Sequence, residues 1–178
     1  MAVDKYSKDY RLVDSVDDRG RIRTETEYVG ERYDFTAGET AARAAARKMA
    51  VFCLLAWLSF FAALFLPSAA MKTLYAALPC AFTALPLWHL SAAVWTALRV
   101  KLPFVHKDAD RLNLRLPAAA AFAVILPGFA ILGELVSLLF AKPAMLAGDW
   151  VFLAGNGLCL IFVLLCRRHR SAVEAKAL

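Results

Sequence analysis

One acidic side chain stands inside an otherwise apolar stretch of this chain, and it is the first residue to which chemistry can be assigned. Glu134 lies between Leu116 and Phe140, where no other residue carries a charge. In a lipid bilayer a central charge costs about 2.5–3.5 kcal/mol, so an ionisable residue there marks a functional site by default. Two roles stay open for Glu134: a structural hydrogen-bonding group, which we favour, or a proton or cation site.

Two further polar residues are placed where they could meet Glu134. Ser137 sits one helical turn away on the same face. Asn156 belongs to the next apolar stretch and lies roughly 9–10 Å from the end of its helix, at about the depth of Glu134. We therefore expect Asn156 and Glu134 to hydrogen-bond across a helix interface. Three glycines would permit close approach of the two helices: Gly133, Gly155 and Gly157.

His89 is the other polar candidate within an apolar stretch. It lies about 15 Å deeper than Glu134, by the rise of an α-helix, so the two side chains are not expected to pair. We interpret His89 as a neutral hydrogen-bonding residue of the helix core, or as a polar contact near the inner leaflet. A ligand role is the less favoured alternative.

Other patterns that could carry chemistry are weak. His106, Asp108 and Asp110 have a spacing that could hold a divalent ion, but such triplets are common on short solvated loops. The four cysteines form no C-x-x-C pair, which argues against a metal site or a redox dithiol. No nucleotide-binding glycine pattern, zinc-protease motif or nucleophile elbow is present. The sequence therefore predicts no metal, no cofactor and no enzymatic activity.

The elements that carry these residues are long apolar stretches. The chain has 178 residues, of which 61% are hydrophobic, against about 45–50% in soluble domains. Four stretches approach the roughly 20 residues needed to cross a bilayer: 49–66, 73–98, 116–140 and 150–166. Pro79 and Pro86 are expected to kink the long second span. The predicted fold is an all-α integral membrane protein with a polar arm (1–47), a four-helix transmembrane domain (48–166) and a basic tail (167–178).

The distribution of charge predicts an orientation. The first 48 residues carry ten Lys or Arg, the middle loop five and the tail four, whereas the two other connections hold only Lys72 and Lys142. By the positive-inside rule, the N-terminus, middle loop and C-terminus are expected in the cytoplasm, with the chain in the plasma membrane. Since this rule already accounts for the net charge of +6, no nucleic-acid partner is expected.

The polar arm contains a candidate β-hairpin. Runs near 10–16 and 21–29 mix apolar and charged residues around a turn signal at Asp18-Arg19-Gly20. A lone two-stranded hairpin is marginally stable in water. It is therefore expected either to pack on the cytoplasmic loop or on a partner, or to be largely disordered.

Three aromatic residues follow closely in the same arm: Tyr28, Tyr33 and Phe35. They could form a docking epitope for a protein partner, because exposed aromatic side chains anchor interfaces. The favoured alternative is that they lie back on the membrane surface or on the arm itself.

The end of the arm predicts the start of the first helix. Thr36 and Glu39 match a capping box, so this helix is expected to start near residue 37. Arg43, Arg47 and Lys48 are expected to contact anionic lipid headgroups.

The third span shows two contrasting faces. Small and polar residues recur on one face at Ala120, Ala123, Pro127, Ala130, Glu134, Ser137 and Ala141; bulky residues occupy the other at Phe122, Ile125, Phe129, Leu132, Val136 and Leu139. We expect the first face to pack within the bundle and the second to face lipid.

The functional expectation is a non-enzymatic accessory or interaction subunit. Its arm, loop and tail would be presented to a protein partner, or to another copy of the chain. The alternative is an oligomeric small transporter or channel that uses Glu134 and Asn156 as an intramembrane polar site.

Overall fold

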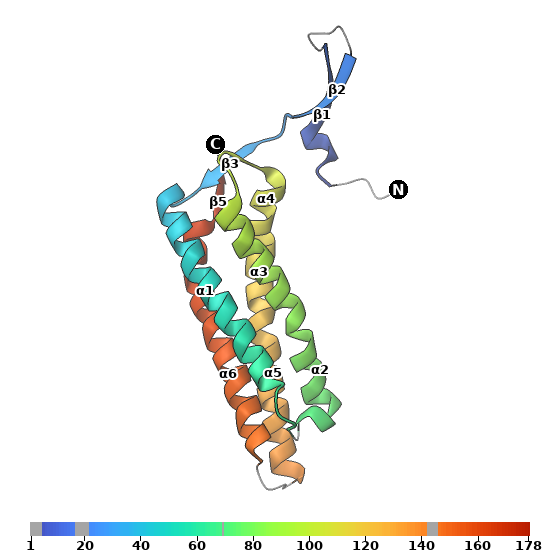
Figure 1. The fold of residues 1–178 in the computed structure, drawn as a ribbon, viewed down its shortest axis with the longest axis vertical. Coiled ribbons are helices and arrows are strands. Elements are labelled where there is room, and N and C mark those ends of the chain that lie inside the picture. Colours follow the sequence, from blue (N-terminus) through green and yellow to red (C-terminus); the bar gives the residue numbers. More distant parts are fainter. Residues whose placement is uncertain (1–4, 17–21, 69, 142–145) are drawn as a thin grey trace.

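Four long helical segments run side by side and antiparallel, with two small sheets at one end (Figure 1). The computed structural model describes residues 5–16, 22–68, 70–141 and 146–178. The bundle consists of α1 (Glu39–Ala63), α2 (Leu74–Phe82) followed by α3 (Ala84–Arg99), α5 (Leu116–Ala141) and α6 (Ala147–Arg168). Short 3-10 turns lie at Ser7–Asp9, Ala70–Lys72 and Arg170–Val173.

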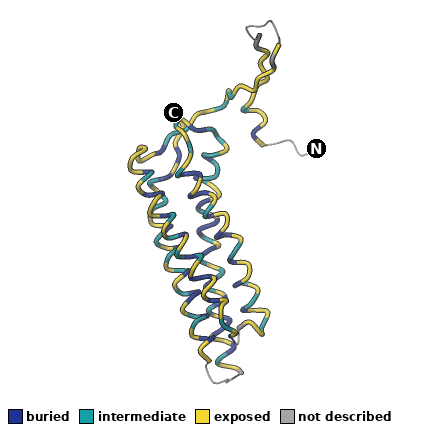
Figure 2. Tube along the Cα trace, viewed as in Figure 1, coloured by how far each residue is buried: buried dark blue, intermediate teal, exposed yellow. Residues whose placement is uncertain are grey.

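Within the described residues, four helical segments are long and apolar enough to cross a membrane: Glu39–Ala63, Leu74–Arg99, His106–Phe140 and Ala147–Arg168. The third includes α4 (His106–Asp110) and the π-helical segment Arg111–Arg115, which lead directly into α5. Many large apolar side chains of the helices are exposed, whereas alanines make up much of the buried core. Buried and exposed positions alternate along each helix (Figure 2). This arrangement suits a lipid solvent, where close helix packing depends on small residues. The four long apolar helices and the hairpin predicted from the sequence are confirmed.

The second predicted span is divided between α2 and α3 at Thr83. Pro86 lacks the amide hydrogen that would bond to the carbonyl of Phe82, so the helix is interrupted there. The Thr83 hydroxyl donates to the Pro79 carbonyl at 2.9 Å, and the Leu87 amide donates to the Thr83 carbonyl at 3.2 Å. Hydrogen bonding therefore continues through the interruption, as expected for a kink.

The helices pack in a four-membered bundle. α1 lies against α6 and α3, and α5 lies against α6, α2 and α3. Gly155 brings α6 close to α1, since a Cβ there would lie 2.7 Å from that of Ala63. Gly133 does the same for α5 and α2, where an added Cβ would lie 2.7 Å from that of Ala76. The expectation that these glycines join α5 to α6 is wrong, and Gly157 faces open space.

The N-terminal hairpin has the predicted strands. β1 (Tyr10–Val16) pairs antiparallel with β2 (Ile22–Tyr28), in a register that places Tyr10 opposite Tyr28 and Leu12 opposite Thr26. The turn predicted at 18–20 lies outside the described residues. In Figure 1 the hairpin extends away from the bundle.

A second, three-stranded sheet was not predicted. Its central strand β3 (Arg32–Phe35) pairs antiparallel with β4 (Phe104–Val105) and with β5 (Ala175–Ala177). Arm, middle loop and tail therefore meet in one structure at the end of the bundle. We call it the end sheet. Asn113 holds β5 from the side, because its amide nitrogen and oxygen bond to the carbonyl and amide of Ala175, each at 2.9 Å.

The predicted capping box at the start of α1 is wrong. The helix begins at Glu39 after Gly38, and no side chain caps it. The Thr36 hydroxyl and amide instead donate to the carbonyl of Glu174, at 2.9 and 2.8 Å. Formation of the end sheet therefore takes the Thr36 side chain away from the helix terminus.

Arg43 also differs from its predicted role. Its guanidinium donates to the carbonyls of Ala97 and Leu98, at 2.9 and 2.6 Å, and to that of Val100. Ala97 and Leu98 lie in the last turn of α3, whose carbonyls have no partners within the helix, and Val100 follows its end. Arg43 thus caps α3 rather than facing lipid, because a neighbouring helix end presents better acceptors than the solvent does.

Candidate functional site

The base of the hairpin is fixed to the middle loop by a polar cluster. The backbone amide of His106 donates to the Tyr28 hydroxyl at 2.9 Å, and that hydroxyl donates to the Glu31 carbonyl at 2.7 Å. The His106 ring nitrogen Nδ1 lies 3.2 Å from an Asp9 carboxylate oxygen. Tyr28 is one of the three aromatic candidates for docking. It is half-buried and links the hairpin to the middle loop by these hydrogen bonds.

Asp110 completes this cluster. It accepts hydrogen bonds from Lys5 and from the Tyr6 hydroxyl, the latter at 2.9 Å, and lies 3.6 Å from Nε2 of His106. The bond to Asp110 raises the pKa of Lys5, and burial raises the pKa of Tyr6. Two members of the H-x-D-x-D pattern, His106 and Asp110, thus come together, and Asp110 binds the ammonium group of Lys5.

The third member of that pattern, Asp108, turns toward Arg111 instead, at 3.6 Å. Within the described residues, no three His, Cys, Asp or Glu side chains are grouped so that they could hold a metal ion.

Tyr33 and Phe35 are packed inside the end sheet. Phe35 is 1% exposed and its ring lies 5.2 Å from that of Phe104. The Tyr33 ring stacks on Phe104 and His106, at 6.4 and 5.8 Å. In this conformation the Phe35 ring faces the chain's own core and is not presented to a partner.

The exposed apolar surface of the arm lies on the hairpin. In the β1–β2 register, Tyr10 and Leu12 share a face with Thr26 and Tyr28, because directly opposed residues point to the same side. Leu12 and Ile22 are 72% and 73% exposed. The opposite face carries charged residues such as Arg11 opposite Glu27. We call the face that carries Tyr10, Leu12 and Ile22 the apolar hairpin face; the hydrogen-bonded pair of Asp14 and Thr24 lies on it as well. The sequence showed apolar residues among charges here, but no docking role was assigned to this face.

Within α5, the predicted division into two faces is confirmed. Ala120, Ala123, Pro127, Ala130, Glu134 and Ser137 are buried, whereas Phe122, Ile125, Phe129, Leu132, Val136 and Leu139 are exposed. The side chain of Ala141 lies outside the described part. Glu134 is completely buried, so its carboxyl group is enclosed by the bundle.

The polar residues near Glu134 have partners in α2 and within α6. The Ser137 hydroxyl lies 2.9 Å from that of Tyr75 and 3.5 Å from that of Thr73, which connects α5 to the start of α2. Asn156 donates to the Phe152 carbonyl at 3.0 Å and accepts from the Cys80 thiol at 3.9 Å.

The small face of α5 that carries Gly133 is pressed against α2, and Ser137 reaches the same helix. Because α5 lies against α6 as well, a hydrogen bond between Glu134 and Asn156 stays a prediction.

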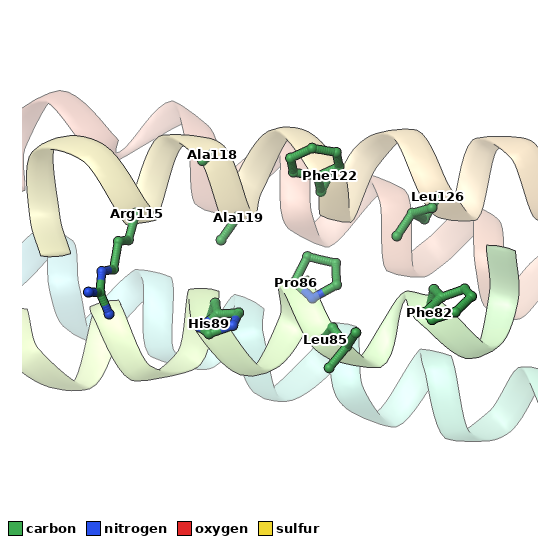
Figure 3. Close-up of a pocket in the computed structure, with 9 residues that line it drawn as sticks. All are labelled: Phe82, Leu85, Pro86, His89, Arg115, Ala118, Ala119, Phe122 and Leu126. Carbon is green, nitrogen blue, oxygen red and sulfur yellow. The ribbon is translucent and has the colours of Figure 1, made fainter. Parts of the chain in front are cut away.

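His89 is exposed on α3, contrary to the expectation of a residue in the helix core. It lines a groove of about 570 Å³ between the α2–α3 segment and α5 (Figure 3). Arg115, at the start of the α5 span, lines the same end of the groove and its side chain points toward α3. The sequence did not predict that His89 and Arg115 line one groove, because Arg115 has the position of an ordinary basic residue that flanks a membrane span.

The four cysteines are buried and free. Cys53 and Cys166 have sulfur atoms 4.0 Å apart between α1 and α6, and Cys80 bonds to Asn156 between α2 and α6. They occupy positions where small side chains allow the helices to meet.

Comparison with protein-family models, with curated proteins and with solved structures found no match for this chain.

Proposed function

We propose that this chain is a multi-pass protein of the plasma membrane with both termini in the cytoplasm, and that it serves as a non-enzymatic accessory subunit. Its β1–β2 hairpin docks a protein partner through the apolar hairpin face. The chain reaches that partner from the cytoplasmic side of the membrane.

The location is supported by length, composition and charge. Four helical segments can cross a membrane, and the Lys and Arg residues are concentrated in the arm, middle loop and tail. β3, β4 and β5 bring these three segments to one end of the bundle. The basic segments thus share one end, as the positive-inside rule requires of a cytoplasmic face.

The docking role rests on one observation: the hairpin has an exposed apolar face while its base is firmly held. A two-stranded hairpin gains little stability by itself, and Leu12 and Ile22 point into solvent. The bonds of Tyr28 to His106 and Glu31 keep the hairpin next to the end sheet. A protein partner that covers this face would bury the apolar surface and stabilise the strands.

Site-specific photocrosslinking in cells tests the docking role. A photoreactive amino acid at Leu12 is expected to give a defined protein adduct. The same amino acid at Glu25, on the charged face opposite Val13, serves as the matched control and is expected to give none. Adducts only with lipid, or none from either position, would contradict a docking role for the hairpin.

A second candidate function is an oligomeric small transporter or channel. It is favoured by one observation, the complete burial of Glu134 and Asn156 within the bundle. Reconstituted flux of a solute or ion that is lost in Glu134→Gln would support this function over the accessory role. If Glu134→Gln preserves expression, stability and flux, ionisation of Glu134 has no part in it.

A further inference from the structure

The groove between the α2–α3 segment and α5 has one basic end and apolar walls (Figure 3). Its apolar lining consists of Phe82, Leu85, Pro86, Ala118, Ala119, Phe122 and Leu126. The two remaining lining residues, His89 and Arg115, lie at one end of the groove (Figure 3). That end is the one nearer the end sheet, because β4 lies between the end of α3 and the start of α5. A volume of about 570 Å³ falls within the usual range for ligand sites. The groove is therefore polarised along its length, as an amphiphile is.

The basic end continues into a smaller hollow. This hollow, of about 290 Å³, is lined by His89 and Arg115 again, and by Arg111, Trp95 and Thr96 among others. Three basic side chains thus converge where the groove opens toward the end sheet. Trp95 carries the guanidinium of Arg99 above its ring at 3.9 Å. Trp and Arg side chains at one level are typical of the membrane–water interface.

The charge of Arg115 at this end is available to an anion. Among the described ion pairs, Arg111 lies 3.6 Å from Asp108, and none involves Arg115. Arg115 is exposed. An anionic group placed between Arg115, Arg111 and His89 would receive charge-assisted hydrogen bonds, which are stronger than neutral ones.

The length of the groove matches one lipid leaflet. Arg115 and Leu126 are 11 residues apart, which is about 16 Å along a continuous helix. Half of a hydrocarbon core about 30 Å thick is about 15 Å. A headgroup held at Arg115 would therefore place an acyl chain along the apolar walls as far as the bilayer centre.

We propose that this groove binds one anionic phospholipid of the leaflet on the side of the end sheet. The phosphate sits between Arg115 and Arg111, next to His89, and one acyl chain lies against Phe122 and Leu126. The inference rests on the membrane placement proposed above, but it requires neither a protein partner nor a particular function of Glu134.

The wild-type chain provides the first test. The protein is reconstituted in vesicles of equal parts phosphatidylglycerol and phosphatidylcholine with matched acyl chains, released gently, and analysed by native mass spectrometry. We expect one retained phospholipid for each chain, with phosphatidylglycerol enriched over its bulk fraction. Retention of the two lipids in their bulk ratio would overturn the proposal. The hairpin crosslinking experiment measures protein adducts instead. Failure of one experiment therefore leaves the proposal tested by the other standing.

Two variants locate the site. Arg115→Gln is expected to lower the retained phosphatidylglycerol about fivefold, in keeping with the contribution of one basic residue near an anionic surface. Ala118→Phe fills the groove and is expected to lower retention of the lipid without a change of charge. The controls are Arg168→Gln, an exposed basic residue in the last turn of α6 at the same end of the bundle, and Ala62→Phe, an exposed alanine on α1. An equal loss in variants and controls would overturn the assignment to this groove.

Discussion

The helical bundle and the end sheet are built from different kinds of contact. In the bundle, small residues such as Gly155 let neighbouring helices meet, and bulky residues face outward. In the end sheet, β3 pairs with strands about 70 and 140 residues further along the chain, as Arg32 with Val105 and Phe35 with Ala175 show.

The hairpin forms a third kind of structure beside these two. Its strands pair only with each other, and its apolar face remains exposed. The contrast teaches that the end sheet belongs to the folded core of the protein, whereas the hairpin is a separate surface held by its base.

The largest loss of stability is expected from a substitution at the centre of the end sheet. Phe35→Ala removes a buried ring that packs on Phe104, and such truncations cost about 3–5 kcal/mol. The measurement is the free energy of unfolding in detergent micelles, together with hydrogen exchange of the β3 and β5 amides. Phe65→Ala, at an 84% exposed position, is the matched control. Equal values for the two variants would show that the end sheet is not part of the cooperative fold.

A smaller loss of stability is expected from a substitution that forces α1 and α6 apart. Gly155→Ala places a Cβ 2.8 Å from the Ser59 carbonyl oxygen and the Ala63 amide nitrogen, so the helices must separate. Overpacking of this kind costs about 1–3 kcal/mol. Gly157→Ala meets nothing within 4 Å and should leave the unfolding free energy unchanged or slightly higher. The reverse order of stability would contradict the packing of α6 on α1.

The cap of α3 by Arg43 is expected to contribute a similar or smaller amount to the free energy of unfolding. Arg43→Met leaves the carbonyls of Ala97 and Leu98 without their donor, and a bond to a charged group contributes about 1.5–3 kcal/mol. Partial exposure of the guanidinium places this effect at the lower limit. Arg47→Met, at an exposed position, is the control. Faster hydrogen exchange at the end of α3 in Arg43→Met alone would confirm the cap.

The smallest effect on stability is expected in the hairpin. Leu12→Ser changes an exposed side chain, and such surface changes usually stay within about 0.5 kcal/mol. The same change is expected to abolish the photocrosslinked adduct, measured with the probe at Ile22, an exposed position on the same face as Leu12. A large loss of stability would show that the hairpin packs on the bundle and is not an independent surface.

The sequence predicted the bundle because its signals are local. Runs without charge define the helices, Pro86 marks the kink, and the alternation of small and bulky residues orients α5. Each signal depends on residues within a few turns of one another. The strands of the hairpin were predictable for the same reason, since the mixed apolar and charged runs and the turn signal lie within twenty residues.

The end sheet and the groove could not be predicted in this way. β4 and β5 are two and three residues long, too short to show an alternating pattern. Thr36 and Arg43 matched local roles, but they bond to Glu174 and to the end of α3. The groove depends on how far α3 and α5 rotate about their axes, which a single sequence does not specify.

The central claim is that four helices cross a membrane and bring both ends of the chain to one face. Cysteine labelling in intact cells with a membrane-impermeant maleimide tests it directly, against a low background because the native cysteines are buried. Leu146→Cys, before α6, should be labelled without opening the cells, whereas Ser7→Cys and Ala177→Cys should be labelled only after permeabilisation. Labelling of Ser7→Cys and Ala177→Cys from opposite faces would contradict the account.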